Sequence, residues 1–264
     1  MKRKIYIAVA VVLLLTGLCI LLYPTVTRLF SHKEINTVVE DFKASLETVS
    51  PIKEEENILP SAIQESTEGS ENSDESASQK AEVRFTAEQS KRLYKDFYAY
   101  NLDLIENGQS SFGDPFIFED ESISLAQYGL SSSVAAVVSA PAINMELPVY
   151  LGATEENMYM GAAHLSRTSL PIGGESTNSV IAGHTGMVSA VMFDNIVKLN
   201  KGDDVYITNF WDTLSYKVID TKIIEPKESN EILIEKGRDL VTLITCYPYG
   251  SNTHRYLVIC ERVK

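Results

Sequence analysis

The chain has 264 residues, an apolar fraction of 44% and a formal net charge of −13. This length is enough for one domain of ordinary size with additional segments. Positions 54–79 hold eight acidic residues and no lysine or arginine, so the rest of the chain carries a net charge of only −5. The acidity is therefore mostly a property of one segment, and no basic excess remains that would indicate a nucleic-acid-binding protein.

The N-terminal segment predicts a membrane anchor. Lys2, Arg3 and Lys4 precede an uncharged run over 5–23, which is close to the roughly 20 residues that a helix needs to cross a bilayer. Because the basic residues come first, we expect a single-pass protein of the plasma membrane whose remaining residues lie on the extracellular face. A cleaved signal peptide is the alternative, but no small-x-small cleavage site follows the run. Residues 1–27 are therefore assigned to the cytoplasmic residues and the anchor, with 5–23 in contact with lipid.

Two segments separate this anchor from the rest of the chain. Residues 28–85 are interpreted as an extracellular stalk followed by an acidic linker, in which 28–50 has a spacing compatible with one helix. The part rich in Glu, Ser and Asn over 51–82 lacks the apolar residues needed to order itself. Residues 86–132 then begin with a helical pattern that ends at 107–108 and has an N-cap at Thr86. The residues that define this pattern are Leu93, Phe97, Tyr100 and Leu104.

Residues 133–264 form the β-rich part of the chain. We expect short strands over 135–138, 147–150, 179–182 and 222–224, and a brief helix over 189–197. Two hairpins are also expected, one pairing 204–209 with 213–219 and one pairing 239–246 with 255–262. Strands dominate and their spacing is irregular, which predicts a mostly β fold, either a barrel or a sandwich.

The last hairpin brings a thiol and a guanidinium together. Cys246 ends the first run, a loop of Pro, Gly, Ser and Asn follows, and Arg255 begins the second run. We expect these two residues to lie opposite one another, where a cation favours the thiolate form of cysteine. A surface ion pair is the alternative role for the arginine. Cys260 is expected to be a small buried apolar residue, and three cysteines are too few for a disulfide scaffold.

A nucleophilic cysteine needs an acid–base partner, and four histidines are available. His32 follows the anchor and His164 precedes an ordinary loop, while His254 should point away from the face that carries Arg255. His184 stands between two glycines directly after a buried strand, where backbone can turn sharply, and is the best placed by local context. A simple turn residue is the alternative. No metal or cofactor is predicted, because the sequence lacks C-x-x-C, H-x-x-x-H, P-loop and G-x-G-x-x-G motifs.

The residues around the cysteine resemble a known family. The run over 242–246 resembles the TLxTC signature of sortases, which are membrane-anchored cysteine transpeptidases of mostly Gram-positive bacteria. The longer run over 245–255 is similar to the TCxPYGxNTHR sequence of class C, pilin-polymerising sortases. Residues 164–174 and Gly183-His184 are similar to the same class around its catalytic histidine. The resemblance covers about 90–263, and the run over 245–255 is highly specific.

The resemblance implies an eight-stranded β-barrel and a catalytic set of Cys246, His184 and Arg255. Cys246 is expected to attack the Thr–Gly bond of an LPxTG-like sorting signal and form a thioacyl enzyme. An amine, in class C a pilin lysine, then resolves this intermediate. The expected partners are therefore pilin or surface-protein substrates, and Thr245 is expected to support the oxyanion or the substrate.

A loop before the barrel also matches the class. Asp114, Pro115 and Phe116 are similar to the lid motif of class C enzymes, an Asp-Pro-aromatic loop across the active site. This resemblance implies that Asp114 approaches the site and that Phe116 fills the substrate groove. An ordinary surface turn is the alternative.

The sequence departs from the class at two places. Thr185 stands where many members have arginine, and the residues end at Lys264, whereas many members carry a second membrane helix. Either one anchor is used or the sequence is truncated. Three further functions remain open: a housekeeping-type sortase that joins proteins to cell-wall peptide, a plain cysteine peptidase, and a non-enzymatic tethered barrel that binds peptides.

Overall fold

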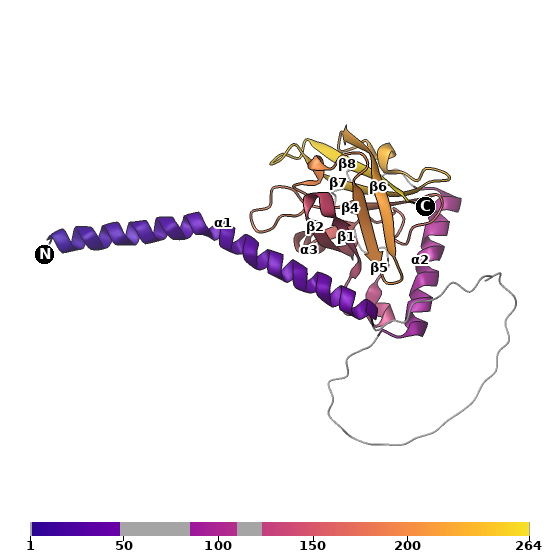
Figure 1. Cartoon of the computed structure of the whole chain (residues 1–264), viewed down its shortest axis with the longest axis horizontal. Helices are drawn as coiled ribbons and strands as arrows, with labels where there is room; N and C mark the ends of the chain where they lie inside the picture. Colours follow the sequence, from indigo (N-terminus) through magenta and orange to yellow (C-terminus); the bar gives the residue numbers. More distant parts are fainter. Residues whose placement is uncertain (1, 48–84, 110–122, 264) are drawn as a thin grey trace, which may run out of the picture.

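A computed structural model describes residues 2–47, 85–109 and 123–263 (Figure 1). Eight strands close into a barrel in the order β1-β2-β3-β4-β7-β8-β6-β5. This result confirms the barrel and excludes the sandwich. The strands are β1 (Val134–Ala140), β2 (Met145–Leu151), β3 (Ala162–His164), β4 (Thr177–Ala182), β5 (Asp204–Asn209), β6 (Thr213–Ile224), β7 (Asp239–Tyr247) and β8 (His254–Arg262).

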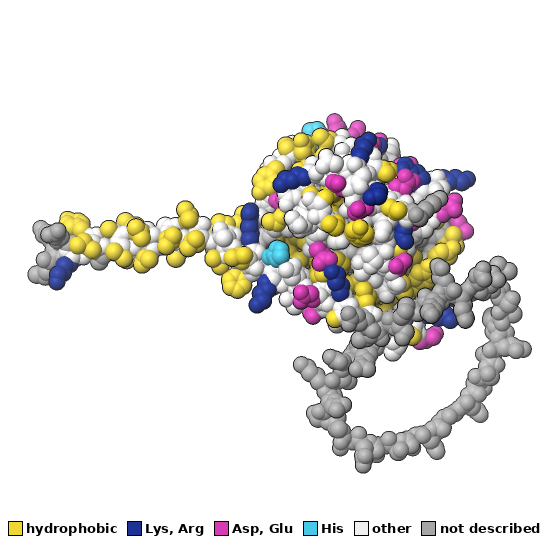
Figure 2. Space-filling model, viewed as in Figure 1, with side chains coloured by type: hydrophobic (Ala, Val, Ile, Leu, Met, Phe, Trp, Pro, Cys, Tyr) yellow, Lys and Arg dark blue, Asp and Glu magenta, His cyan; other side chains and the backbone are white. Residues whose placement is uncertain are grey.

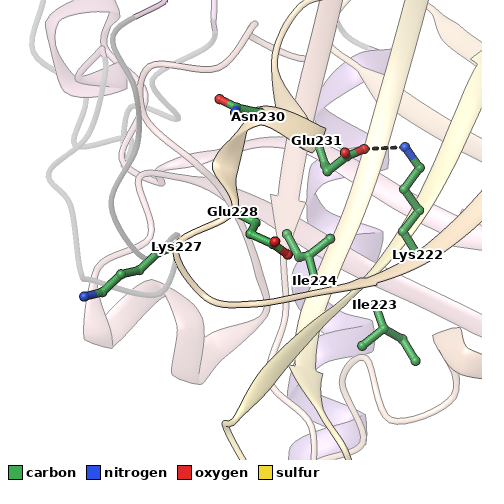
Figure 3. A pocket seen from close by; sticks show the side chains of 7 residues that line it. All are labelled: Lys222, Ile223, Ile224, Lys227, Glu228, Asn230 and Glu231. Atoms are coloured by element: carbon green, nitrogen blue, oxygen red, sulfur yellow. Dashed lines mark hydrogen bonds and ion pairs between the residues drawn. The ribbon is translucent and has the colours of Figure 1, made fainter.

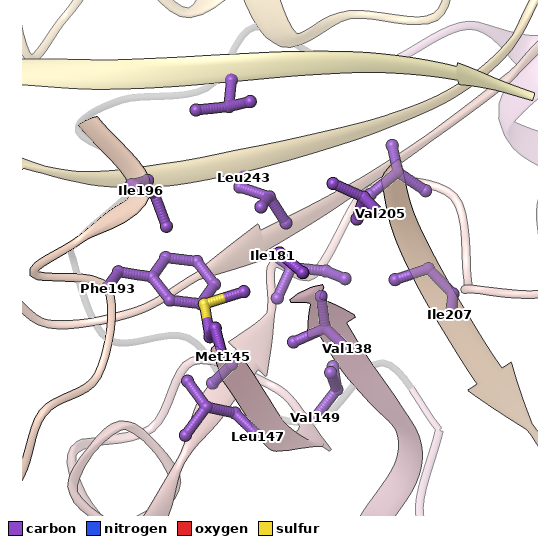
Figure 4. Close-up of a cluster of buried hydrophobic side chains, with 14 of the residues drawn as sticks. Val138, Met145, Leu147, Val149, Ile181, Phe193, Ile196, Val205, Ile207 and Leu243 are labelled. Atoms are coloured by element: carbon purple, nitrogen blue, oxygen red, sulfur yellow. The ribbon is translucent and has the colours of Figure 1, made fainter. Parts of the chain in front are cut away.

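The barrel interior is a packed apolar core (Figure 4). Inward-facing side chains alternate with outward-facing ones along the strands, as the two-residue period of a strand requires. Small residues such as Ala136 and Ala162 stand among large ones, so that the narrow interior is filled. The labelled members are Val138, Met145, Leu147, Val149, Ile181, Phe193, Ile196, Val205, Ile207 and Leu243.

Two helices cover one outer face of the barrel. α1 (Lys2–Glu47) is continuous from the anchor into the stalk, and its second half packs along β2 and β1 (Figure 1). α2 (Ala87–Asn107) has the expected periodicity, because Leu93 and Phe97 are fully buried, and Thr86 closes a capping box with Gln89. Pro24 stands inside α1, which bends along its length as a helix containing proline does.

A third apolar layer lies on another outer face. The connection from β6 to β7 carries η4 (Ser229–Ile232), whose Ile232 is fully buried against outward-facing residues of β4, β7 and β8. The Asn178 side chain donates to the carbonyls of Ile232 and Leu233 and so fixes the connection across the barrel. The remaining short helices are η1 (Leu125–Tyr128), η2 (Pro141–Ile143), α3 (Glu155–Met160) and η3 (Ile196–Lys198).

Several sequence expectations about the elements are wrong. The segment over 189–197 is a loop with only η3 at its end, because its backbone is held by the Asp194 carboxylate and by burial of Met192 and Phe193. The expected strand over 222–224 is the end of β6, which continues through an irregularity between Val218 and Asp220. β3 and α3 were not expected.

Candidate active site

Three adjacent strands bring the predicted residues to one end of the barrel. β4 and β7 are parallel neighbours, with Ala182 opposite Ile244, so both chains leave the sheet at the same end. His184 follows β4, and Cys246 is the next-to-last residue of β7. β8 is antiparallel to β7 and begins at this end with His254 and Arg255. The order β4-β7-β8 therefore places a histidine, a cysteine and an arginine side by side.

Cys246 and Arg255 are paired directly in the register of β7 and β8, as the hairpin predicted. Directly opposite residues on antiparallel strands have Cβ atoms about 4.5–5.5 Å apart. The Cys246 side chain is half-buried, and its position at the strand end leaves the thiol open to a substrate. Cys260, on β8, is fully buried as expected, and burial raises the pKa of its thiol.

The guanidinium of Arg255 is held in place by backbone. Only 3% of Arg255 is exposed, and its Nη1 donates to the carbonyl oxygens of Asn252 and His254, each at 2.9 Å. These bonds tie the arginine to the β7–β8 loop. The neighbouring His254 is exposed, which agrees with the expectation that the two side chains point in opposite directions.

His184 is positioned by the residues before it. The Gly183 amide donates to the carbonyl of Ile244 at 3.1 Å, and the Thr245 hydroxyl donates to the Gly183 carbonyl at 2.6 Å. The strand that carries the cysteine thus also holds the backbone that carries the histidine. This hydrogen bond gives Thr245, which is buried, a positioning contact one residue before the thiol.

Steric contact with Phe193 explains why a glycine stands at position 183. A Cβ added there would lie 2.5 Å from Cγ of Phe193, well inside contact distance. The Phe193 ring therefore packs flat on the backbone, and the Phe193 amide donates to the His184 carbonyl at 2.9 Å. This hydrogen bond joins the two ends of the loop over 185–192 beside His184.

Burial lowers the pKa of His184 below its ordinary value, since the half-buried ring loses hydration of the charged form. A neutral imidazole at neutral pH can accept a proton, and a nearby thiol can supply one. The same ring, once protonated, can return the proton to a leaving amine. The site thus brings together a thiol, an imidazole and a fixed guanidinium, which can serve as a nucleophile, an acid–base group and a cation for a developing negative charge.

A hollow of about 570 Å³ lies between the end of β6 and the β6–β7 connection, and none of Cys246, His184 and Arg255 lines it (Figure 3). Its floor comes from the end of β6, where Ile224 is paired with Arg255. Its rim is charged, and Lys222 forms an ion pair with Glu231 across it. The sequence did not predict this hollow, because it forms only when the β6–β7 connection folds back over the end of β6. Its lining residues are Lys222, Ile223, Ile224, Lys227, Glu228, Asn230 and Glu231.

Asp114, Pro115 and Phe116 lie outside the described residues, as does the acidic segment over 54–79. The residue nearest to the lid segment on its N-terminal side is Gln109. Its amide nitrogen donates to the Arg167 carbonyl, and its amide oxygen accepts from the Ile234 amide at 2.7 Å. Gln109, the last described residue before this segment, is therefore bound to the β6–β7 connection.

The chain is similar to known proteins in sequence and fold. Residues 138–263 match the sortase domain family. Sortase C-1 from Actinomyces oris is 38% identical, with a TM-score of 0.58 over 66% of this chain and 99% of that one. A pilus-related sortase C of Group B Streptococcus is 34% identical, with a TM-score of 0.60 over 67% of this chain and 90% of that one. Sortase A from Bacillus anthracis is 33% identical over 126 residues, or 48% of this chain. The chain spans 58% to 66% of the length of the curated relatives that it matches.

Proposed function

Because the chain belongs to the sortase family, we propose that it is a membrane-anchored cysteine transpeptidase that polymerises pilin subunits. The observation that carries this proposal is the pairing of Cys246 with Arg255 beside β4, the strand that His184 follows. A helix long and apolar enough to cross a membrane lies near the N-terminus, which supports a single-pass anchor with the barrel on the extracellular face.

In the first half-reaction, the Cys246 thiol gives its proton to His184, and Sγ attacks the threonine carbonyl carbon of an LPxTG-like signal. The negative charge on the carbonyl oxygen is stabilised by the Arg255 guanidinium. The Thr–Gly C–N bond then breaks, and His184 gives the proton to the leaving glycine amine. The products are a thioester on Cys246 and a peptide that begins with glycine.

In the second half-reaction, an amine attacks the thioester carbonyl and gives a proton to His184. The C–S bond breaks, the sulfur leaves as a thiolate, and an amide joins the two substrates. We propose a pilin lysine as the amine, since the similar structures include a sortase C described as pilus-related. The hollow beside Arg255, with its isoleucine floor and charged rim, suits a peptide with both apolar and polar residues.

The test separates the possible acceptors. The purified chain is incubated with an LPxTG peptide and one of three acceptors: a pilin domain with its lysines, a cell-wall peptide amine, or water alone. Transfer to the pilin lysine, found by mass spectrometry, is the expected result. Transfer only to the cell-wall amine would indicate the housekeeping function, which similarity to a sortase A favours. Hydrolysis alone would indicate a peptidase, and no acylation would indicate a binding protein.

We also propose that Asp114, Pro115 and Phe116 form a lid that restrains access to Cys246. The support is the class C resemblance of the motif and the attachment of Gln109 to the β6–β7 connection. The variant Asp114→Ala/Phe116→Ala should speed modification of Cys246 by a soluble thiol reagent. Asp103→Ala/Tyr98→Ala, on exposed positions of α2, is the matched control. An unchanged rate in the lid variant would refute the lid.

A further inference from the structure

The loop between His184 and Phe193 is attached to the anchor helix. The Arg28 side chain donates from Nε to the carbonyl of Val188 at 3.1 Å. Ala190 and Met192 are buried in the barrel core, in the same cluster as Ile35 of α1. The loop is therefore held from both sides, by the barrel beneath it and by α1 beside it.

Apolar side chains remain outside at this junction. On the loop, 59% of Val188 and 46% of Val191 is exposed, and on α1 67% of Leu29 and of Phe30 is exposed. We call these four residues the apolar collar. Leu29 and Phe30 follow Arg28 directly and Val191 is three residues after Val188, so the four side chains lie at a similar level along α1, where exposed apolar residues indicate a contact surface. Figure 2 shows hydrophobic side chains along the part of α1 that extends away from the barrel and where it reaches the barrel.

The position of the apolar collar along α1 indicates that it lies at the level of the membrane surface. Arg28 is five residues after Tyr23, where the uncharged run ends, which is about 7.5 Å along a helix axis at 1.5 Å per residue. The headgroup layer on each side of a bilayer is roughly 5–8 Å thick. Val188, bonded to Arg28, thus falls at the level of the lipid headgroups.

The charges at this level agree with a lipid surface. Between positions 24 and 33 the chain has Arg28 and Lys33 and no acidic residue. Basic side chains there are attracted to the anionic headgroups, while valine and phenylalanine side chains can enter the boundary with the acyl chains. Tyr23, at the end of the span, is of the type enriched in such interfaces.

From these contacts we infer that the apolar collar rests in the bilayer surface and holds the active-site end of the barrel beside the membrane. The inference depends on the proposed membrane anchor. Val188 is four residues after His184, so their Cα atoms are at most about 14 Å apart. The histidine therefore lies within roughly 30 Å of the end of the membrane span, measured through the loop, the Arg28 side chain and the helix.

Tryptophan quenching by lipids with brominated acyl chains tests this inference in the full chain in nanodiscs. Trp211 is the only tryptophan, and its signal, measured in the parent chain, is subtracted. Val188→Trp and Val191→Trp report the collar. Val263→Trp, exposed at the other end of β8, is the matched control, and Leu15→Trp reports insertion of α1.

The expected result is quenching of at least about twofold at positions 188, 191 and 15, with none at 263, because interfacial side chains reach the acyl boundary. Quenching at 15 while 188 and 191 behave like 263 would overturn the collar and leave the anchor intact. Equal quenching at 263 and 188 would also overturn it. No quenching at 15 would refute the anchor and the collar together.

Discussion

The two ends of the parallel pair β4 and β7 have opposite characters. At one end, His184 and Cys246 are half-buried and open to a substrate. At the other end, where β7 begins, the Asp239 carboxylate accepts hydrogen bonds from the Gly174 amide and the Tyr216 hydroxyl, both at 3.0 Å. Hydrogen bonds thus fix the start of β7, whereas the end of β7 leaves its chemical groups accessible. Reactive groups gain from access, whereas buried polar groups stabilise a fold only when they are bonded.

His164, at the end of β3, and His184, which follows β4, show a similar contrast between burial and access. His164 is fully buried with Nε2 3.0 Å from the Ser169 carbonyl oxygen, and burial lowers its pKa to about 4. His184 is only half-buried, and burial lowers its pKa without locking the ring into the fold. The first histidine supports the fold, and the second has the access that proton transfer needs.

The largest expected effect of a substitution that keeps charge is at the reactive end. Arg255→Lys, opposite Cys246 in the strand register, loses the planar guanidinium that binds the carbonyls of Asn252 and His254, so acyl transfer should fall on the order of 10²–10³-fold. Single-turnover acylation of Cys246 measures this rate. Arg262→Lys, on the other end of β8, is the control and should keep the parent rate per folded molecule; equal losses in both variants would contradict the contrast between the ends.

The next effect concerns pH and the buried histidine. His164 should be neutral in the folded chain and charged in the unfolded chain between pH 6.5 and 4, so the unfolded state binds the extra proton. The free energy of unfolding should therefore fall by about 3 kcal/mol as the pH drops through this window. Urea unfolding at several pH values measures it.

His164→Gln should remove most of that pH dependence. His184→Gln should keep it, since the ring at the reactive end is less buried. A parent chain whose unfolding free energy is flat between pH 6.5 and 4 would show that the buried histidine is not what sets the acid limit.

The smallest effect is expected at the start of β7. Asp239→Asn replaces one acceptor oxygen with an amide group that faces donors, so the free energy of unfolding should fall by about 1–3 kcal/mol. The acylation rate per folded molecule should stay within about twofold of the parent, because the change lies at the end remote from the thiol. Asp204→Asn, in an exposed ion pair with Lys217, is the control with little expected change. A large loss of acylation rate in Asp239→Asn would mean that the two ends are not independent.

The hairpin that carries Cys246 could be predicted from the sequence because the residues that determine it are close together in the chain. Apolar runs, turn residues and loop length together predicted the pairing of Cys246 with Arg255, which the register confirms. The burial of Cys260 and the helix around Leu93 and Phe97 were readable for the same reason, since a local period determines which side chains face inward.

The pairing of strands that are far apart in the sequence could not be predicted in this way. The local pattern around His184 fits either a turn or a site, and only the parallel pairing of β4 with β7 brings it to the cysteine. β3 was missed because three residues are too few to show a period. The loop before Phe193 was mistaken for a helix because the pattern cannot reveal that Asp194 binds backbone amides there.

The most direct test of the proposed chemistry is the intact mass of the chain after incubation with an LPxTG peptide and no acceptor. The parent and Asp239→Asn should gain the mass of the acyl fragment, and Cys246→Ala should gain nothing. Peptide mapping should place the adduct on Cys246. An adduct that persists in Cys246→Ala, or no adduct in the parent with any sorting peptide, would contradict a thioacyl mechanism at this site.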